Sequence, residues 1–281
     1  MRWKGRRESD NFEDRRGMSG RGLAVGGGIG AIVIALIVSF LGGDPGQVLQ
    51  QLQTAAPQQE QAVEISAEEK ELTSFVRTVL ASTEDVWAHL FQQEEATYQK
   101  PTLVVYRDQT STECGAGLTA MGPFYCPADQ KLFIDLSFND ELKNRFGAPG
   151  EFAMVYVIAH EVGHHIQHLN GTMDKVQQMR GRLSEKEYNK LSVKLELQAD
   201  FLAGVWAHHA NQLEQLLEEG DIEAGLQAAN AIGDDKLQMQ TQGQIVPDAF
   251  THGTSAQRVY WFKKGYESGD INQGDTFNND R

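Results

Sequence analysis

The stretch from about Glu151 to Leu169 constrains the fold more than any other, because it predicts a buried helix that carries polar side chains. Its first half, residues 152–159, is apolar on nearly all sides, which is typical of a helix inside a core. Its second half contains the pattern H-E-x-x-H, from His160 to His164. Imidazole and carboxylate groups are costly in such a core unless they bind something. We therefore expect the chain to be organised around this helix.

The H-E-x-x-H pattern predicts a zinc site. His160 and His164 lie one turn apart on the same helix face, so both rings can bind one zinc ion at about 2.0–2.1 Å. Glu161 follows the first histidine, where it can take a proton from a water molecule that the metal polarises. The same pattern also occurs by chance on ordinary helices. A zinc site therefore requires a third ligand from elsewhere in the chain.

Glu196 is the best candidate for this third ligand. One common continuation of the pattern has a third histidine six residues after the second, but Asn170 occupies that position. Glu196 and Asp200 are spaced to share a helix face, so Glu196 can bind the metal and Asp200 can accept the ring N–H of a ligating histidine. Two histidines and one glutamate leave one position for water, as a catalytic zinc site requires. The alternative is a solvated acidic face, which the many apolar neighbours disfavour: Leu195, Leu197, Phe201, Leu202, Val205 and Trp206.

Three further polar residues are candidates for the same site. His252 lies in a Thr-His-Gly loop ahead of a helix, where it can donate a hydrogen bond to the oxyanion of a reacting carbonyl; the alternative is a structural histidine. Arg258 can pair with Asp200 or be a surface charge. His168 lies one further turn along the metal-binding face, but most such histidines are structural.

Charge and hydropathy predict a membrane anchor. The chain of 281 residues has a net charge of −14, and an acidic body argues against a nucleic-acid partner. Leu23 to Leu41 carries no charged residue, which predicts a transmembrane helix over residues 23–42. A buried core helix and a cleaved signal peptide are the alternatives. The basic residues before the span predict a cytoplasmic, disordered stub over residues 1–22, with the remainder of the chain outside the cytoplasm.

The rest of the chain divides by composition. Residues 43–64 are rich in Gln and predict a flexible linker, residues 65–270 predict one folded domain, and residues 271–281 predict a polar tail. Cys114 and Cys126 are the two cysteines of the sequence and lie in the exported part. An oxidising compartment favours a disulfide between them. Two free thiols, or half of a metal site, are the alternatives.

Local signals predict an α+β fold that is mostly helical. Capping boxes at Ser66–Glu69, Ser184–Glu187 and Thr254–Gln257 predict helix starts. Residues 102–106 and 131–136 are typical of strands. Together with a Gly-rich stretch between them, they predict a small, mainly antiparallel sheet just before the H-E-x-x-H helix.

The combination of His160-Glu-x-x-His164 with Glu196-x-x-Ala-Asp200 resembles the gluzincins, zinc peptidases whose third ligand is glutamate. More narrowly, residues 65–270 resemble the bacterial putative neutral zinc metallopeptidase family, with further matches around Cys114, Cys126, His252 and Arg258. The resemblance implies a zincin-like domain with one Zn²⁺ per chain. An N-terminal anchor is usual in that family, so it also implies a single-pass protein of the bacterial inner membrane with a periplasmic or extracellular catalytic domain.

These observations predict a membrane-anchored zinc endopeptidase that hydrolyses a peptide or protein substrate, with Glu161 as general base. The resemblance also suggests that the strand at residues 131–136 offers its edge to an extended substrate. The alternative function is a non-catalytic, membrane-tethered binding or scaffold module that zinc stabilises. Such a module would have a fourth protein ligand in place of water, and His168 and His252 are the residues that could supply it.

Overall fold

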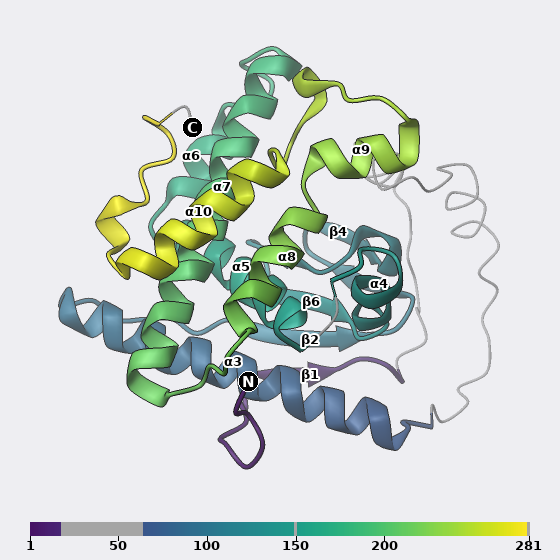
Figure 1. Cartoon of the computed structure of the whole chain (residues 1–281), viewed down its shortest axis with the longest axis vertical. Helices are drawn as coiled ribbons and strands as arrows, with labels where there is room; N and C mark the ends of the chain where they lie inside the picture. Colours follow the sequence, from purple (N-terminus) through teal and green to yellow (C-terminus); the bar gives the residue numbers. More distant parts are fainter. Residues whose placement is uncertain (18–63, 149–150, 280–281) are drawn as a thin grey trace.

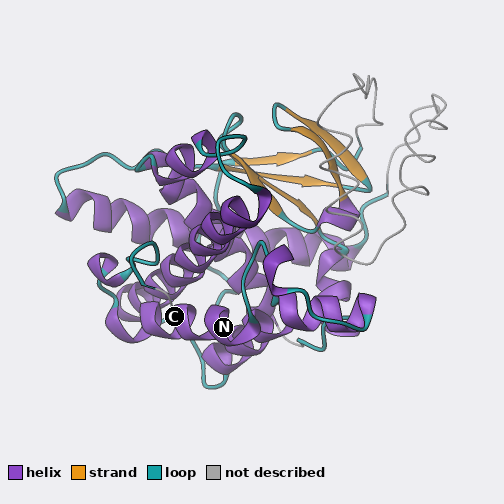
Figure 2. Cartoon of the chain, turned by 90° about the horizontal axis from the view of Figure 1, so that it is seen from above, coloured by secondary structure: helices purple, strands orange, loops and turns teal. Residues whose placement is uncertain are grey.

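The computed structural model describes residues 1–17, 64–148 and 151–279. Helices form most of the molecule, and the strands gather on one side of it (Figures 1 and 2). The helices are α3 (Ala67–Gln93), α4 (Phe138–Asn144), α5 (Glu151–Leu169), α6 (Thr172–Gln178), α7 (Glu185–Glu214), α8 (Asp221–Ala231), α9 (Asp234–Gln242) and α10 (Ser255–Ser268). The strands are β1 (Phe12–Asp14), β2 (Thr102–Tyr106), β3 (Gln109–Thr112), β4 (Gly115–Leu118), β5 (Phe124–Cys126) and β6 (Lys131–Asp135).

The larger sheet has the strand order β1-β2-β6-β5. β1 pairs with β2 and β2 with β6 in parallel, whereas β5 pairs with β6 in the antiparallel direction. β3 and β4 form a separate antiparallel hairpin. The expectation of a mainly antiparallel sheet was therefore wrong. Parallel neighbours need long connections along the chain. Here α3 lies between β1 and β2 in the sequence, and the β3–β4 hairpin and β5 lie between β2 and β6 in the sequence.

The N-terminal residues belong to this fold, which corrects the expectation of a disordered cytoplasmic stub. β1 forms the outer strand of the sheet, and Trp3 is buried against Phe75 of α3. The Trp3 indole donates a hydrogen bond to Glu151, the first residue of α5 (3.0 Å). The N–H of Arg2 donates to the carbonyl of Leu216 (2.8 Å), beyond the end of α7. Residues 1–17 thus fasten α3, α5 and the segment after α7 to one another.

The transmembrane helix and the inner-membrane location are likewise corrected. In the part of the chain that the structure describes, no helix combines the length and the apolar character needed to cross a bilayer. The span expected at residues 23–42 lies outside the described residues. The segments on either side of the expected span also contradict the expected topology. Residues 1–17 precede it and α3 follows it, and the two segments pack against each other in the same folded domain. A single crossing between them would have placed residues 1–22 and the folded domain on opposite sides of a membrane.

Glu84 of α3 anchors the N-terminal residues. Its buried carboxylate accepts hydrogen bonds from Ser9 (2.5 Å) and Asn11 (2.6 Å), and it pairs with Arg7 (3.1 Å) and Lys100 (3.4 Å). Burial alone would raise the pKa of Glu84, but these donors and cations hold the pKa below its ordinary value. The ionised carboxylate therefore stabilises the docked N-terminal residues.

We expect Glu84→Gln to lower the free energy of unfolding by about 1–3 kcal/mol, because the amide keeps one acceptor oxygen but loses the other and the negative charge. The wild-type contribution is present above the ordinary glutamate pKa of about 4.5 and is lost as the pH falls through the lower pKa of the folded state. Amide hydrogen exchange should show faster exchange across β1 in the variant at neutral pH. Glu68→Gln, at an exposed position of the same helix, is the control. Equal protection of β1 in both variants would contradict the anchoring role.

The helical core positions the H-E-x-x-H helix. Every residue of α5 from Phe152 to Gln167 is buried, as the apolar sequence predicted. α5 packs against α7 so closely that a Cβ on Gly163 would lie 2.9 Å from the carbonyl oxygen of Ala199. Glycine at this position therefore lets the two helices approach each other beside His160 and His164.

Other local predictions had mixed outcomes. The three capping boxes are present at the starts of α3, α7 and α10, and each is complete in both directions. The first of these helices, α3, continues without interruption from Ala67 to Gln93. The residues of the predicted polar tail pack on α7: the Thr276 hydroxyl donates to the carbonyl of Lys194 (2.6 Å) and the Lys194 ammonium to that of Phe277 (2.8 Å).

Candidate metal centre

Three potential ligands converge between α5 and α7. His160 and His164 extend from one face of α5, and Glu196 reaches them from α7. Glu196 Oε2 lies 3.1 Å from Nε2 of His160, and Oε1 lies 3.4 Å from Nε2 of His164. One ligand atom from each of the three residues lies within 4.8 Å of the other two. The structure thus brings together the three residues that the sequence singled out.

The geometry and chemistry of this group fit a zinc ion. Ligand atoms at 2.0–2.1 Å from a tetrahedral centre lie about 3.3 Å apart, close to the observed separations from Glu196. Two imidazoles and one carboxylate are a donor set that zinc prefers. Within the described residues the group has three members, and neither His168 nor His252 belongs to it. Three protein ligands are the usual number in catalytic zinc sites, whereas structural sites usually have four.

Asp200 fixes the ring of His160. Its carboxylate is fully buried and accepts the Nδ1–H of His160 at 2.8 Å, which leaves Nε2 facing the metal position. The hydroxyl of Tyr156 donates to the same carboxylate. Arg258 donates from Nε to Oδ2 (2.8 Å) and from Nη2 to Oδ1 (3.0 Å), so the predicted pairing of Arg258 with Asp200 is present. Burial alone would raise the pKa of Asp200, but Arg258 and His160 hold it at about 2.

The buried carboxylates raise the pKa values of His160 and His164, so they favour bound protons at the place where a metal cation would bind. Burial alone would lower the pKa of His160, but the carboxylates of Asp200 and Glu196 raise it to about 10. Burial opposes the charge on Glu196 as well, yet His164 and His252 lower its pKa well below the ordinary value. The charge of the buried carboxylates is thus balanced by protons in the absence of metal, and a divalent cation can replace them.

Glu161 is buried beside the two histidines. It lies on α5 directly after His160, and only 8% of its surface is exposed. Burial raises its pKa above the ordinary glutamate value, while the nearby imidazoles of His164 and His160 act in the opposite direction. A raised carboxylate pKa suits a group that must take up a proton and release it again.

His252 lies on the loop before α10, and Asp234 orients it. The charge of His252 contributes to lowering the pKa of Glu196, so the two groups interact electrostatically. Its Nδ1 lies 3.2 Å from Oδ1 of Asp234, the first residue of α9. Oδ2 of Asp234 accepts the backbone N–H groups of Thr251, His252 and Gly253 at 2.7–3.0 Å. The sequence analysis missed Asp234, because residues 18 positions apart give no local signal of contact.

The other two histidines of α5 lie away from the ligand group. His165 is buried, its Nε2–H donates to the carbonyl of Gln99 (2.6 Å), and its Nδ1 accepts the hydroxyl of Tyr125 (2.9 Å). Burial lowers the pKa of His165 to about 4. His168 lies beside the ring of Tyr125, with Nδ1 3.6 Å from Asp174. These side chains connect α5 to β5 and α6.

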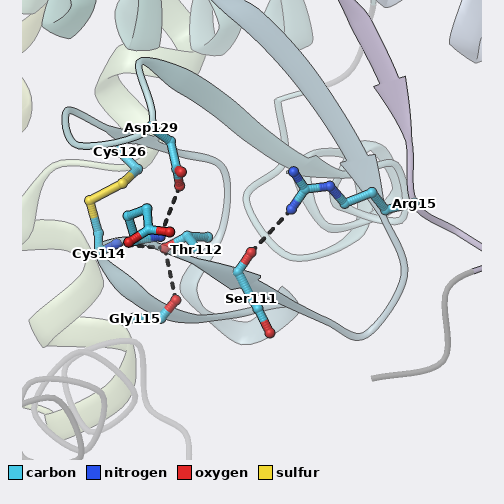
Figure 3. Close-up of a disulfide and its surroundings, with 8 residues drawn as sticks. Arg15, Ser111, Thr112, Cys114, Gly115, Cys126 and Asp129 are labelled. Carbon is cyan, nitrogen blue, oxygen red and sulfur yellow. Dashed lines mark hydrogen bonds between the residues drawn. A yellow bond between two sulfur atoms is a disulfide. The ribbon is translucent and has the colours of Figure 1, made fainter. Parts of the chain in front are cut away.

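The two cysteines form the disulfide Cys114–Cys126 (Figure 3). It ties the turn between β3 and β4 to the end of β5. The hydroxyl of Thr112 spans the same turn by donating to the carbonyl of Gly115 (2.8 Å) and accepting the N–H of Cys114 (3.0 Å). The disulfide therefore holds the hairpin against the larger sheet, on the side where β5 contacts α5.

Comparison with known proteins gives a family match. The model of the family described as putative neutral zinc metallopeptidase matches residues 1–277. The uncharacterized protein YpfJ of Escherichia coli strain K12 is 52% identical over 286 residues, covering 99% of each chain. The uncharacterized protein Rv2575 of Mycobacterium tuberculosis strain H37Rv is 40% identical over 207 residues, covering 70% of this chain and 67% of that protein. No solved structure shows a significant match. The resemblance noted in the sequence is thereby confirmed.

Proposed function

The chain belongs to the putative neutral zinc metallopeptidase family, and from this premise we propose that it hydrolyses peptide bonds with one zinc ion held by His160, His164 and Glu196. The observation that carries the proposal is the convergence of these three donors beside a buried glutamate. Each donor projects from a long helix packed in the core, so the fold itself positions the three donors together. The proposed substrate is a peptide or protein.

Each residue of the centre has a role in this proposal. Bound zinc would act as a Lewis acid that polarises a water molecule and the scissile carbonyl. Glu161 accepts a proton from that water and later donates it to the leaving amine. Asp200 keeps the Nδ1 proton on His160, so that Nε2 remains a ligand. Arg258 balances the charge of Asp200, and the hydroxyl of Tyr156 donates a hydrogen bond to it, in a place that water does not reach.

His252 is the proposed donor to the oxyanion that develops on the carbonyl. Asp234 holds its Nδ1 side, which directs Nε2 away from α9. Burial alone would lower the pKa of His252, but Glu196 and Asp234 raise it above the ordinary value. The ring is therefore protonated over a wider pH range, and an imidazolium donor stabilises negative charge better than a neutral one.

The sheet edge available to an extended substrate differs from the expected one. β6 lies between β2 and β5, so its residues 131–133 are paired on both sides and cannot receive a substrate strand as suggested. β5 is the outer strand on that side, and it contacts α5 through Tyr125 and His165. Strand addition, if it contributes to binding, would use β5.

The test of the proposed function uses the full chain, because residues 1–17 are part of the fold. The purified protein should contain one zinc per chain by elemental analysis. It should also cleave members of a quenched-fluorescence peptide library, lose this activity with a chelator and regain it with added zinc. A folded protein that binds no zinc would refute the proposal. Tight zinc binding without cleavage of any library member would favour the binding-module alternative.

We expect His252→Ala to lower kcat/KM by about 10²–10³-fold, the usual effect of removing one oxyanion donor, while zinc content stays at one per chain. Asp234→Asn should have a smaller effect in the same direction, because the donor remains but its orientation and charge are weaker. Steady-state kinetics on the best library peptide, with metal analysis of each variant, measure both effects. Wild-type kcat/KM in His252→Ala would exclude the proposed role.

A further inference from the structure

We infer that Gln167 is a positioning residue that locks His164 and the turn of α7 carrying Glu196 to each other; this inference rests on the proposed zinc site. Gln167 lies three residues after His164 on α5, and its side chain is fully buried. Its amide makes hydrogen bonds to groups on both helices that supply ligands. The sequence analysis missed this residue, although a spacing of three places it near the second histidine.

The hydrogen bonds of Gln167 define the orientation of its amide. Nε2 lies 2.7 Å from the carbonyl oxygen of Leu195 and 3.0 Å from Oε1 of Gln198. The carbonyl of Leu195 can only accept, so the NH₂ group must face α7. Oε1 then faces His164 and accepts its Nδ1–H at 2.9 Å. This contact places the ring proton on Nδ1 and leaves Nε2 of His164 free to bind the metal.

The same amide fixes the position of the third ligand. Leu195 precedes Glu196 and Gln198 follows it by two residues, so both contacts of the NH₂ group lie on the turn of α7 that carries the glutamate. Gln198 is held in turn from the other side, where its Nε2 donates to the carbonyl of Gly274 (3.1 Å). A continuous set of hydrogen bonds therefore runs from His164 through Gln167 to α7 and the C-terminal residues.

The hydrogen-bond partners explain why the residue beside His164 is an amide, Gln167, whereas the residue beside His160 is a carboxylate, Asp200. The partners of Asp200 are all donors, from His160, Tyr156 and Arg258, so a carboxylate satisfies them. Gln167 faces one donor and two acceptors, which requires one acceptor and two donors from a single side chain. A glutamate at position 167 would place its negative charge against the acceptor oxygens of Leu195 and Gln198, without water to screen the repulsion.

Two variants of the full chain test the inference. Gln167→Met keeps the size of the side chain and removes all three hydrogen bonds. Gln167→Glu keeps the acceptor for His164 and loses both donors to α7. Gln178→Met, on an exposed part of α6, is the matched control. Zinc affinity is measured by competition with a chromophoric chelator, and the ring N–H protons of His160 and His164 are followed by ¹H–¹⁵N NMR.

We expect zinc affinity to fall by about 10- to 100-fold in Gln167→Met and to remain unchanged in the control. The slowly exchanging ring N–H signal of His164 should disappear in Gln167→Met, whereas that of His160, bound to Asp200, should persist. In Gln167→Glu the His164 signal should remain while zinc affinity still falls, which separates the effect on His164 from the effect on α7. This second variant also serves if Gln167→Met does not fold.

Wild-type zinc affinity and an intact His164 signal in Gln167→Met would overturn the inference while leaving the proposed function in place. Failure of the wild-type protein to bind zinc would instead refute the proposed function. In that case the ring N–H signals of the metal-free protein still decide whether Gln167 holds His164.

Discussion

Glu161→Gln is expected to reduce peptide hydrolysis by about 10²–10⁴-fold while one zinc per chain remains bound. The substitution keeps the size of the side chain but removes a carboxylate that can accept a proton. Glu161 is not one of the three converging ligands, so the metal should be retained. Activity of the wild-type protein should rise with pH as Glu161 loses its proton, because only the ionised carboxylate can act as the base.

Two measurements check this prediction. Elemental analysis establishes that wild type and variant contain equal zinc, and the pH dependence of kcat/KM establishes whether the acidic limb belongs to Glu161. In Glu161→Gln the residual activity should lack that limb. A variant that cleaves as fast as the wild type would assign the base to another group.

Glu196→Gln is expected to weaken zinc binding by more than about 100-fold, because it replaces the anionic ligand of a buried site by a neutral amide. The variant also leaves His160 and His164 without the carboxylate that lies 3.1 and 3.4 Å from their Nε2 atoms. Proton binding should change with metal binding: a metal-free wild-type site holds a proton on His160 at neutral pH, since its pKa is about 10, and zinc must displace it.

Chelator competition at several pH values measures this effect. Wild-type affinity should increase by about tenfold per pH unit for each proton displaced, up to the pKa of His160. Glu185→Gln, at an exposed position near the start of α7, is the control and should bind zinc as the wild type does. Equal zinc affinity in Glu196→Gln and the control would show that Glu196 is not a ligand.

Local patterns predicted the parts of the site that lie on single helices. The spacing in H-E-x-x-H and in the Glu196–Asp200 pair requires only that each segment be helical, and the capping box at Ser184 predicts that for α7. The meeting of the two segments was argued from donor chemistry rather than from any spacing. Gly163 shows the physical basis of that meeting, because a side chain there would collide with α7.

Local sequence patterns could not predict the contacts between segments that lie far apart in the chain. β1 has the sequence Phe12-Glu-Asp14, which carries no strand signal, and it becomes a strand by pairing with β2. β2 and β6 are also parallel, and the strand signals of two segments do not show in which direction they pair. Asp234 gave no signal, since a lone polar residue in a helix is typical of a solvated face, and the spacing of Gln167 from His164 did not reveal its contacts with α7. The membrane topology failed for the same reason: hydropathy describes a segment alone, whereas the packing of its flanks on one body depends on contacts across the chain.

The position of the N-terminal residues has a consequence for how the protein is made. Their partners include Glu218 and Asp221, which lie more than 200 residues later in the chain. Both carboxylates accept hydrogen bonds from the amino group of Met1. A ribosome that adds about 5–20 residues per second needs on the order of tens of seconds to deliver those partners. β1 and its partners in β2 and Glu84 of α3 are made much earlier, so this strand can pair before the C-terminal helices exist. The N-terminal residues would therefore be held first by the sheet and α3, and be fastened to the segment after α7 only later in synthesis.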